Sequence, residues 1–209
     1  MPSPNGRLTI MIVEDQRLVL GALAALLELE DDLSVAATAA NGREALERLR
    51  ACPVDIVLTD IEMPEMGGID LARAICDGYS ATQVVILTTF ARSGYLRRAL
   101  DAGARAYLLK DSPSEALAHA IRKVAAGARV VDPELAADAL TEHDPLTDRE
   151  RQILSLVNEG LGNARIGERL CLSEGTVRNY LSEVNGKLGA ANRVEAARIA
   201  REKGWIEGG

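Results

Sequence analysis

The chain has 209 residues, a formal net charge of −7 and an apolar content of 47 %, with few aromatic residues. This length allows two modest domains, and the apolar content is sufficient to bury aliphatic cores. No apolar run approaches the roughly 20 residues of a membrane span, and no secretory signal pattern is visible. The 3 cysteines lack CxxC spacing and fit reduced thiols. We therefore expect a cytoplasmic protein that does not insert into membranes.

Charge is distributed unevenly along the chain. Residues 1–144 carry 14 Lys and Arg against 22 Asp and Glu, whereas residues 145–209 carry 10 against 9. The net charges of the two parts are therefore −8 and +1. The acidic part suits a divalent cation. The second part is close to neutral, so an interaction with nucleic acid must depend on how its basic residues cluster.

The first part of the chain alternates short apolar runs with helical patterns. Near-continuous apolar strands between amphipathic helices are typical of a parallel sheet that helices cover on both faces. The sequence therefore predicts an α/β domain over residues 7–127, built on a doubly wound five-stranded parallel sheet. Strands are expected near residues 8–13, 35–39, 54–59, 83–87 and 106–109, and helices near residues 16–30, 42–51, 67–77, 92–102 and 113–126.

The pattern changes beyond this domain. Residues 128–144 lack strong periodicity and contain two Asp-Pro pairs, so they are interpreted as a linker. Residues 145–206 follow a helical pattern throughout. Thr147 and Glu150 have the spacing of a capping box, and Ser173 is a candidate cap of a later helix. A tight turn before that helix predicts a helix-turn-helix inside a small all-α four-helix domain.

Four predicted strands end in residues that can carry chemistry: Glu14-Asp15, Asp60, Thr88 and Lys110. Ligands bind at the carboxyl ends of the strands in open parallel sheets. Three carboxylates at this edge would repel one another, and a divalent cation such as Mg²⁺ removes the repulsion. Asp60 could then attack a phosphorus atom in line, with Mg²⁺, Lys110 and Thr88 meeting the charge on the phosphoryl oxygens. Taken one at a time, these residues are ordinary turn, cap or surface positions; their combination indicates phosphoryl transfer.

The strand-end residues occur together with three further motifs, namely Met63-Pro64, Gly67-Gly68 and the run 102–110. In this combination they resemble the receiver domain of bacterial two-component response regulators over about residues 7–127. The motif set is specific, because it covers the ends of four strands and the turn after the third. The resemblance implies the strand order 2-1-3-4-5 and a sensor histidine kinase as a partner.

The resemblance also implies a role for each group at the strand ends. Asp60 is implied as the phosphoacceptor, Thr88 as the switch hydroxyl and Lys110 as the phosphate partner. Tyr107 is implied as an aromatic residue that turns inward on activation. Mg²⁺ is the implied cofactor, and its implied protein ligands are Glu14, Asp15, Asp60 and the backbone carbonyl of Glu62.

The helical segment contains a second set of motifs, which includes the run 176–178, Lys187-Leu188 and Arg193. Their spacing is similar to that of the DNA-binding domain of the LuxR/NarL/FixJ type over residues 145–206. This resemblance implies double-stranded DNA as a partner. Two features depart from the family pattern: the recognition helix is less basic than usual, and Gly167 lies inside a helix, where it costs roughly 1 kcal/mol relative to Ala.

Arg178, Asn179 and Ser182 share one face of the predicted recognition helix, opposite its apolar face. They would therefore point into the major groove, where Arg suits guanine and Asn suits adenine. Phosphate contacts position a protein on DNA but read no sequence. The candidate phosphate contacts are Thr176, Tyr180, Lys187, Arg165 and Arg193. Without the family resemblance, the same face would be interpreted as a solvated helix surface.

A homodimer that forms on phosphorylation is expected through the first and fifth helices. The first helix is apolar over more than one stripe, so part of its apolar surface should stay exposed after packing on the sheet. The fifth helix offers small residues that permit close approach. The predicted interface includes Leu18, Val19, Ala116 and Ala120. A competing and more polar surface on the fourth helix and fifth strand carries Arg97, Arg98, Asp101 and Arg105.

The combined interpretation is a transcription factor, not an enzyme, that dimerises and binds DNA when Asp60 is phosphorylated. Two alternatives stay open: a DNA-binding protein whose receiver is structural, and a metal-dependent phosphohydrolase with an aspartyl-phosphate intermediate. The hydrolase would need an Asp where this chain has Glu62. Residues 87–92, 94–95, 110–115 and 203–205 are similar to those of thermosensory regulators of membrane-lipid desaturation. Because less specialised relatives share such runs, membrane-lipid genes are one candidate target.

Overall fold

The protein is described by a computed structural model that covers residues 6–89, 93–133, 135–136 and 144–206. Its contacts divide the chain into two compact units, Met1–Ala91 with Leu96–Ala137 and Arg92–Tyr95 with Asp138–Gly209. The first unit contains the sheet and the second contains the helical segment. In the part of the chain that is described, no helix has the length and apolar character that crossing a bilayer requires.

The sheet of the first unit contains β1 (Leu8–Val13), β2 (Leu33–Ala39), β3 (Ile56–Thr59), β4 (Gln83–Thr88), β5 (Ala106–Leu109) and β6 (Val130–Val131). All neighbours are parallel, in the order β2-β1-β3-β4-β5-β6. The predicted order of the first five strands is confirmed. β6 corrects the predicted strand number, since it lies in the segment interpreted as a linker. Two residues are too few to show an apolar pattern, and β6 is recognisable only from its pairing with β5.

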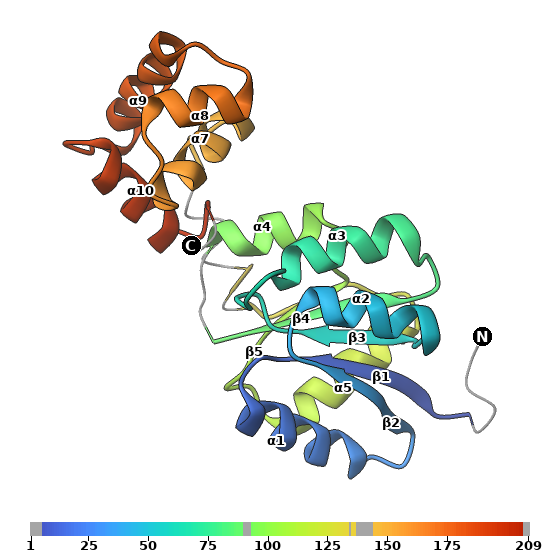
Figure 1. The fold of residues 1–209 in the computed structure, drawn as a ribbon. Coiled ribbons are helices and arrows are strands. Elements are labelled where there is room, and N and C mark those ends of the chain that lie inside the picture. The colour runs from blue at the N-terminus through green and yellow to red at the C-terminus, as the bar shows by residue number, and fades with distance from the viewer. Residues whose placement is uncertain (1–5, 90–92, 134, 137–143, 207–209) are drawn as a thin grey trace. The chain divides into compact units, whose positions relative to one another are not determined.

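Helices connect the strands at the predicted positions, with slightly different ends. They are α1 (Arg17–Glu28), α2 (Gly42–Ala51), α3 (Gly68–Gly78), α4 (Ser93–Asp101) and α5 (Ser114–Ala125). In Figure 1, α1 and α5 lie on one face of the sheet, and α2, α3 and α4 lie on the other. Both faces of the strands are therefore covered, which is why the strands read as nearly continuous apolar runs.

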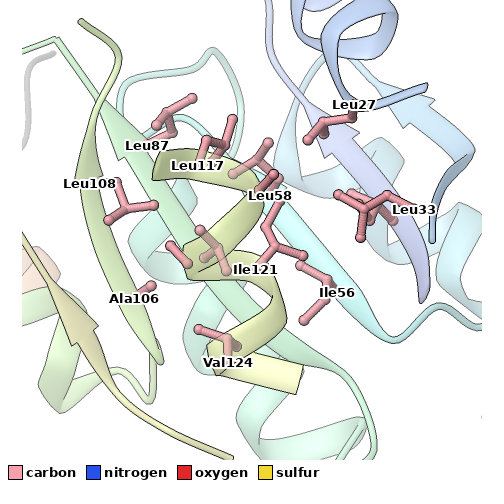
Figure 2. Close-up of a cluster of buried hydrophobic side chains, with 14 of the residues drawn as sticks. Leu27, Leu33, Ile56, Leu58, Leu87, Ala106, Leu108, Leu117, Ile121 and Val124 are labelled. Atoms are coloured by element: carbon pink, nitrogen blue, oxygen red, sulfur yellow. The ribbon is translucent and has the colours of Figure 1, made fainter. Parts of the chain in front are cut away.

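The core under α5 is aliphatic, as the composition predicts. Figure 2 shows Leu117, Ile121 and Val124 of α5 in one cluster with Leu58 and Leu108 of the strands. All five side chains are buried. A fully buried side chain of this size contributes roughly 1.5–3 kcal/mol relative to an exposed one. This packing holds the strands in register and so fixes where each of them ends.

The second unit contains α7 (Asp148–Asn158), α8 (Asn163–Leu170), α9 (Glu174–Leu188) and α10 (Arg193–Glu202). The predicted capping box of α7 is present, and Ser173 Oγ caps α9 by accepting from the Thr176 amide at 3.0 Å. α9 ends at Gly189, whose φ of 62° is left-handed. The core of this unit is again mainly aliphatic, and the buried Trp205 belongs to it.

The turn between α8 and α9 explains a glycine that looked unfavourable in the sequence. Gly167 lies inside α8, and its carbonyl accepts a hydrogen bond from the Leu172 amide at 2.8 Å. A Cβ at Gly167 would lie 2.7 Å from the Leu172 carbonyl oxygen. The missing side chain therefore permits the close approach of the turn to the helix. Cys171, at the end of α8, has a left-handed φ of 55°.

Candidate functional site

The parallel register brings three carboxylates to one edge of the sheet. β1 and β3 pair Val13 with Thr59, so Glu14 and Asp60 follow their strands at the same level. The Asp60 amide donates to the Val13 carbonyl at 3.0 Å. Carboxylate oxygens of Glu14, Asp15 and Asp60 lie within 4.8 Å of one another. These three residues form a carboxylate cluster at the place that the sequence predicts.

Lys110 connects two members of the carboxylate cluster. Its Nζ donates to Glu14 Oε2 at 2.7 Å and to Asp60 Oδ2 at 2.8 Å. Its amide donates to the Thr88 carbonyl at 2.8 Å, which ties the end of β5 to the end of β4. The side chains of Glu14, Lys110 and Asp60 are 1 %, 10 % and 11 % exposed. One ammonium thus lies between two carboxylates that are largely removed from water.

The surroundings of this site disfavour the charged forms of Glu14 and Asp60. Burial raises the pKa of Glu14 and the pKa of Asp60, although hydrogen bonds from Lys110 act in the opposite direction. The neighbouring Asp15 charge adds to the rise at Asp60. Burial would lower the pKa of Lys110, but its hydrogen bonds to Asp60 and Glu14 outweigh burial and raise it. The site therefore holds more negative charge than its ammonium balances, and a divalent cation would relieve the excess.

The loop after Asp60 depends on two glycines. A Cβ at Gly68 would lie 1.9 Å from the Asp60 carbonyl oxygen, and one at Gly67 would lie 2.8 Å from the Ile61 carbonyl oxygen. The Gly68 amide donates to that Ile61 carbonyl at 2.9 Å, and Thr59 Oγ1 donates to the Asp60 carbonyl at 2.9 Å. These contacts hold Asp60 against the start of α3. The pair Gly67-Gly68 predicts a turn from the sequence, whereas the close approach of the two backbone segments is evident only in the structure.

The remaining predicted groups of this edge lie on β4, β5 and the loop. Thr88 is the last residue of β4 and is buried. Tyr107 lies in β5 opposite Ile86 and is also buried, and its predicted role as a switch residue stays a prediction. Glu62 is exposed, and the predicted use of its backbone carbonyl as a metal ligand stays a prediction.

The predicted recognition face of α9 is open to solvent. Arg178, Asn179 and Ser182 are exposed, whereas Val177 and Leu181 on the opposite face are buried. Arg178 Nη2 donates to Glu174 Oε1 at 3.1 Å, one helical turn away. An exposed pair of this kind stabilises a helix by only a few tenths of a kcal/mol, so Arg178 can leave it at little cost.

Lys187 of α9 forms an ion pair that the sequence does not predict. Its Nζ donates to Glu150 Oε1 and Oε2 at 2.8 and 2.7 Å. Glu150 has a side chain 2 % exposed and also accepts from the Thr147 amide at 2.7 Å. Burial would raise the pKa of Glu150, but hydrogen bonds from Lys187 and Thr147 outweigh it, so this pKa is lowered. Lys187 therefore neutralises a buried carboxylate, and its predicted contact with a DNA phosphate stays a prediction.

The other candidate phosphate contacts differ in their exposure and in their hydrogen bonds within the protein. Arg165 is exposed on α8. Arg193 Nη1 donates to Asn163 Oδ1 at 2.8 Å, and so connects the starts of α10 and α8. Tyr180 is half-buried against the core, and Thr176 takes part in the cap of α9. Contacts between these residues and DNA stay predictions.

The α1 surface shows the predicted excess of apolar residues. Leu18, Leu26 and Leu29 are 86 %, 41 % and 80 % exposed. Val19 is half-buried and Ala116 of α5 is exposed. Ala120 is only 3 % exposed and belongs to the core under α5, so the prediction that it faces outward is wrong. It was assigned from its small size, which suits a buried helix–sheet contact equally well.

Comparisons with known proteins assign both units. A model of the response regulator receiver domain matches residues 10–122, and a model of the bacterial regulatory proteins of the luxR family matches residues 144–200. The chain is 46 % identical over 200 residues to the transcriptional regulatory protein DesR of Bacillus subtilis (strain 168), covering 96 % of this chain and 100 % of that protein. It is 49 % identical over 197 residues to an uncharacterised transcriptional regulatory protein of the same strain, YvfU, covering 94 % and 98 %.

Solved structures give the same assignment. The crystal structure of the response regulator ChrA, from a heme-sensing two-component system, is similar with 34 % identity and a TM-score of 0.59, covering 96 % of this chain and 100 % of that one. An RcsB–DNA complex is similar with a TM-score of 0.66, covering 92 % and 96 %, but its 20 % identity shows the fold alone.

Proposed function

Because this chain belongs to the response regulators that join a receiver domain to a LuxR-type DNA-binding domain, we propose that phosphorylation of Asp60 controls its binding to DNA. The observation that carries the proposal is the carboxylate cluster with Lys110 at one sheet edge. The proposed receiver spans residues 7–127 and the proposed DNA-binding domain residues 145–206, joined by the linker 128–144. A sensor histidine kinase is the proposed phosphodonor in the cytoplasm.

The residues of the cluster fit a magnesium ion, because three carboxylates converge and burial raises the pKa of two of them. Mg²⁺, when bound by Glu14, Asp15 and Asp60, would neutralise charge on the phosphoryl oxygens. An Asp60 carboxylate oxygen forms the new bond to phosphorus, and the donor's leaving group departs with the electron pair of the broken bond. Lys110 then exchanges its contact with Asp60 for a phosphoryl oxygen, and the Thr88 hydroxyl can donate to another.

Labelling with a small phosphodonor tests this step. Acetyl phosphate with Mg²⁺ should add one hydroxylamine-labile phosphoryl group, and Asp60→Ala should abolish it. Asp77→Ala is the matched control, because Asp77 is an exposed carboxylate of α3 outside the cluster. Full labelling of the Asp60→Ala variant at another residue would refute the assignment.

We propose the exposed face of α9 as the element that reads DNA. Replacing Arg178 by Ala should cost roughly 1–3 kcal/mol on the preferred site and relax the choice at one base pair. Arg198→Ala is the control, since Arg198 is also an exposed arginine in an ion pair one turn away, with Glu202 of α10. Equal losses on specific and random DNA would mean that Arg178 contacts phosphate instead. Footprinting on genomic DNA would test whether membrane-lipid genes are targets.

We further propose that phosphorylation strengthens a two-fold dimer through α1 and α5. Leu18 and Leu29 supply exposed apolar area, and Ala116 leaves room for close approach. Val19→Asp should keep the labelling of Asp60 but leave the phosphorylated protein monomeric in sedimentation. Arg97→Glu, on the competing surface of α4, should leave the dimer intact. The opposite result for the two variants would move the interface to α4.

A further inference from the structure

A cavity of about 240 Å³ lies at the edge of the sheet opposite the carboxylate cluster. Its walls come from the end of α3, the starts of β4 and β5, and the residue before β6. Arg105 and Arg129 both line it, and none of the described residues that line it is acidic. The cavity is therefore lined by positive charge alone, although residues 1–144 have a net charge of −8.

The arginine side chains are available to a ligand. Arg105 Nε donates to Gln83 Oε1 at 3.1 Å, which is a neutral partner, and Arg105 forms no ion pair with the described residues. Arg129 is exposed and makes no hydrogen bond or ion pair within the described part of the chain. Most other arginines of this unit do contact a carboxylate, as Arg48 does with Glu44 and Arg122 with Asp32.

The backbone around the cavity is fixed. The Arg105 amide donates to the Val84 carbonyl at 2.8 Å, and its own carbonyl accepts from the Val130 amide at 2.9 Å. Arg105 is therefore held between two strands, and Arg129 is held next to it by the start of β6. On the far wall, the Tyr79 amide donates to the Ile75 carbonyl at 2.8 Å and ends α3. The two guanidinium groups thus extend from a rigid frame and need little reorganisation to bind.

The chemistry of the walls defines the class of ligand. Guanidinium groups match the planar oxygen pairs of carboxylates and phosphates through paired hydrogen bonds. Ala72, Ile75 and Val84 give the cavity an apolar side, and Tyr79 adds an aromatic ring. The volume is below the roughly 300–1,000 Å³ of sites for drug-sized molecules. We propose that this cavity, the arginine cavity, binds a small organic phosphate whose carbon part packs on the apolar side.

Titration of the full chain with phenyl phosphate tests the proposal. In two-dimensional NMR spectra of nitrogen-15-labelled protein, the Arg105 and Arg129 Nε–H signals and the Gly103 amide should shift and saturate. Inorganic phosphate, which lacks the carbon part, should bind at least about fivefold more weakly, and phenol should not bind, because the charged contacts provide most of the affinity. Asp60→Ala should bind phenyl phosphate as the wild type does, which separates this cavity from the phosphoacceptor edge.

Charge variants decide the role of the arginines. Arg105→Gln and Arg129→Gln should each weaken binding by about tenfold or more, because each loses a charge-assisted hydrogen bond. Arg50→Gln removes an equal charge from the exposed face of α2 and should change the affinity by less than about twofold. The proposal is overturned if the wild type shows no saturable shift up to about 20 mM, or if Arg50→Gln weakens binding as much as the cavity variants do. Because Arg129 is exposed, its replacement leaves the fold intact even if Arg105→Gln does not.

Discussion

Each unit of the protein contains a buried carboxylate paired with a lysine, and the two pairs have almost the same geometry. In the sheet unit, Lys110 Nζ lies 2.7 Å from Glu14 Oε2, and the carboxylate side chain is 1 % exposed. In the helical unit, Lys187 Nζ lies 2.7 Å from Glu150 Oε2, and that side chain is 2 % exposed. Yet the pKa of Glu14 is raised and the pKa of Glu150 is lowered.

The difference comes from the neighbours of each pair. Lys110 is shared by two carboxylates with Asp15 close by, so burial dominates and the charged forms are disfavoured. Glu150 has a lysine to itself and accepts two further hydrogen bonds from Thr147, so its charge is fully satisfied. The carboxylate cluster of the sheet unit has excess negative charge, which a bound cation would neutralise. In the helical unit, Lys187 balances the charge of Glu150, and the pair connects α7 to α9.

The largest expected loss of stability comes from breaking the Glu150–Lys187 pair of the helical unit. Glu150→Ala leaves the Lys187 ammonium without its partner and removes the capping box of α7. The loss of the cap costs about 0.5–2 kcal/mol and the loss of hydrogen bonds to a charged group about 1.5–3 kcal/mol, which together are a large share of a domain's stability. Trp205 is the single tryptophan of the chain and lies in the core of this unit. Its fluorescence during guanidinium denaturation should therefore report the loss directly.

Two further variants sharpen that result. Glu183→Ala removes an exposed carboxylate of α9 and should change the stability by less than about 0.5 kcal/mol. Lys187→Ala should destabilise the unit about as strongly as Glu150→Ala, because it strands the buried carboxylate. If Lys187→Ala instead left the unfolding midpoint unchanged and only weakened DNA binding, Lys187 would be a phosphate contact after all.

Removing one carboxylate from the Lys110 site of the sheet unit should cost little stability. Asp60→Asn removes one of the carboxylates that share Lys110, and Glu14 keeps the ammonium at 2.7 Å. Relief of repulsion and of charge burial should make the change neutral or stabilising by up to about 1 kcal/mol, while phosphorylation is lost. Hydrogen exchange at the Ile86 and Leu108 amides measures the stability of the sheet. A loss of several kcal/mol would mean that Asp60 is a structural charge like Glu150.

The two units should also respond to pH with opposite signs. Glu14 and Asp60 have raised pKa values in the folded state, so their contribution to stability is present below about pH 4, the ordinary carboxyl value, and is lost as pH rises through the raised values. The pKa of Glu150 is lowered, so its contribution is present above the ordinary value and is lost as pH falls through the lowered one.

Matched variants isolate these contributions from other titrating groups. The stability of Asp60→Asn relative to the wild type should rise as pH increases from about 4 to 7. The stability of Glu150→Gln relative to the wild type should fall as pH rises through the lowered pKa of Glu150 to about 4.5, and should then stay constant. Parallel curves for the two variants would contradict the electrostatic difference between the units.

The sequence predicts which residues lie at the carboxyl edge of the sheet, because each of them directly follows an apolar run in the chain. Four of the five apolar runs end at a residue that can carry chemistry, and the parallel arrangement then places Glu14, Asp60 and Lys110 together. The exposed face with Arg178 follows from the same kind of pattern, whereas the order of the first five strands was implied by the resemblance to receiver domains. The matches to the receiver and luxR-family models over residues 10–122 and 144–200 agree with this prediction.

What the sequence did not reveal depends on partners that are distant in the chain. Lys187 reads as a basic residue on a DNA-binding helix until Glu150, 37 residues earlier, is found beside it. Ala120 reads as a small surface residue until the sheet is placed beneath it. β6 is too short to have a pattern of its own. In each case the missing information is a packing contact, which periodicity does not contain.

The smallest expected effect concerns the turn that precedes the recognition helix. Cys171 ends α8 with a left-handed φ of 55°, which strains most residues that have a side chain and which Asn tolerates better. Cys171→Asn should therefore stabilise the helical unit by a few tenths of a kcal/mol to about 1 kcal/mol without touching the Glu150–Lys187 pair. Cys171→Ala removes the thiol but keeps the strain, so its Trp205 unfolding midpoint should not rise. An equal gain from Ala would place the effect in the thiol, and the backbone argument would then be wrong.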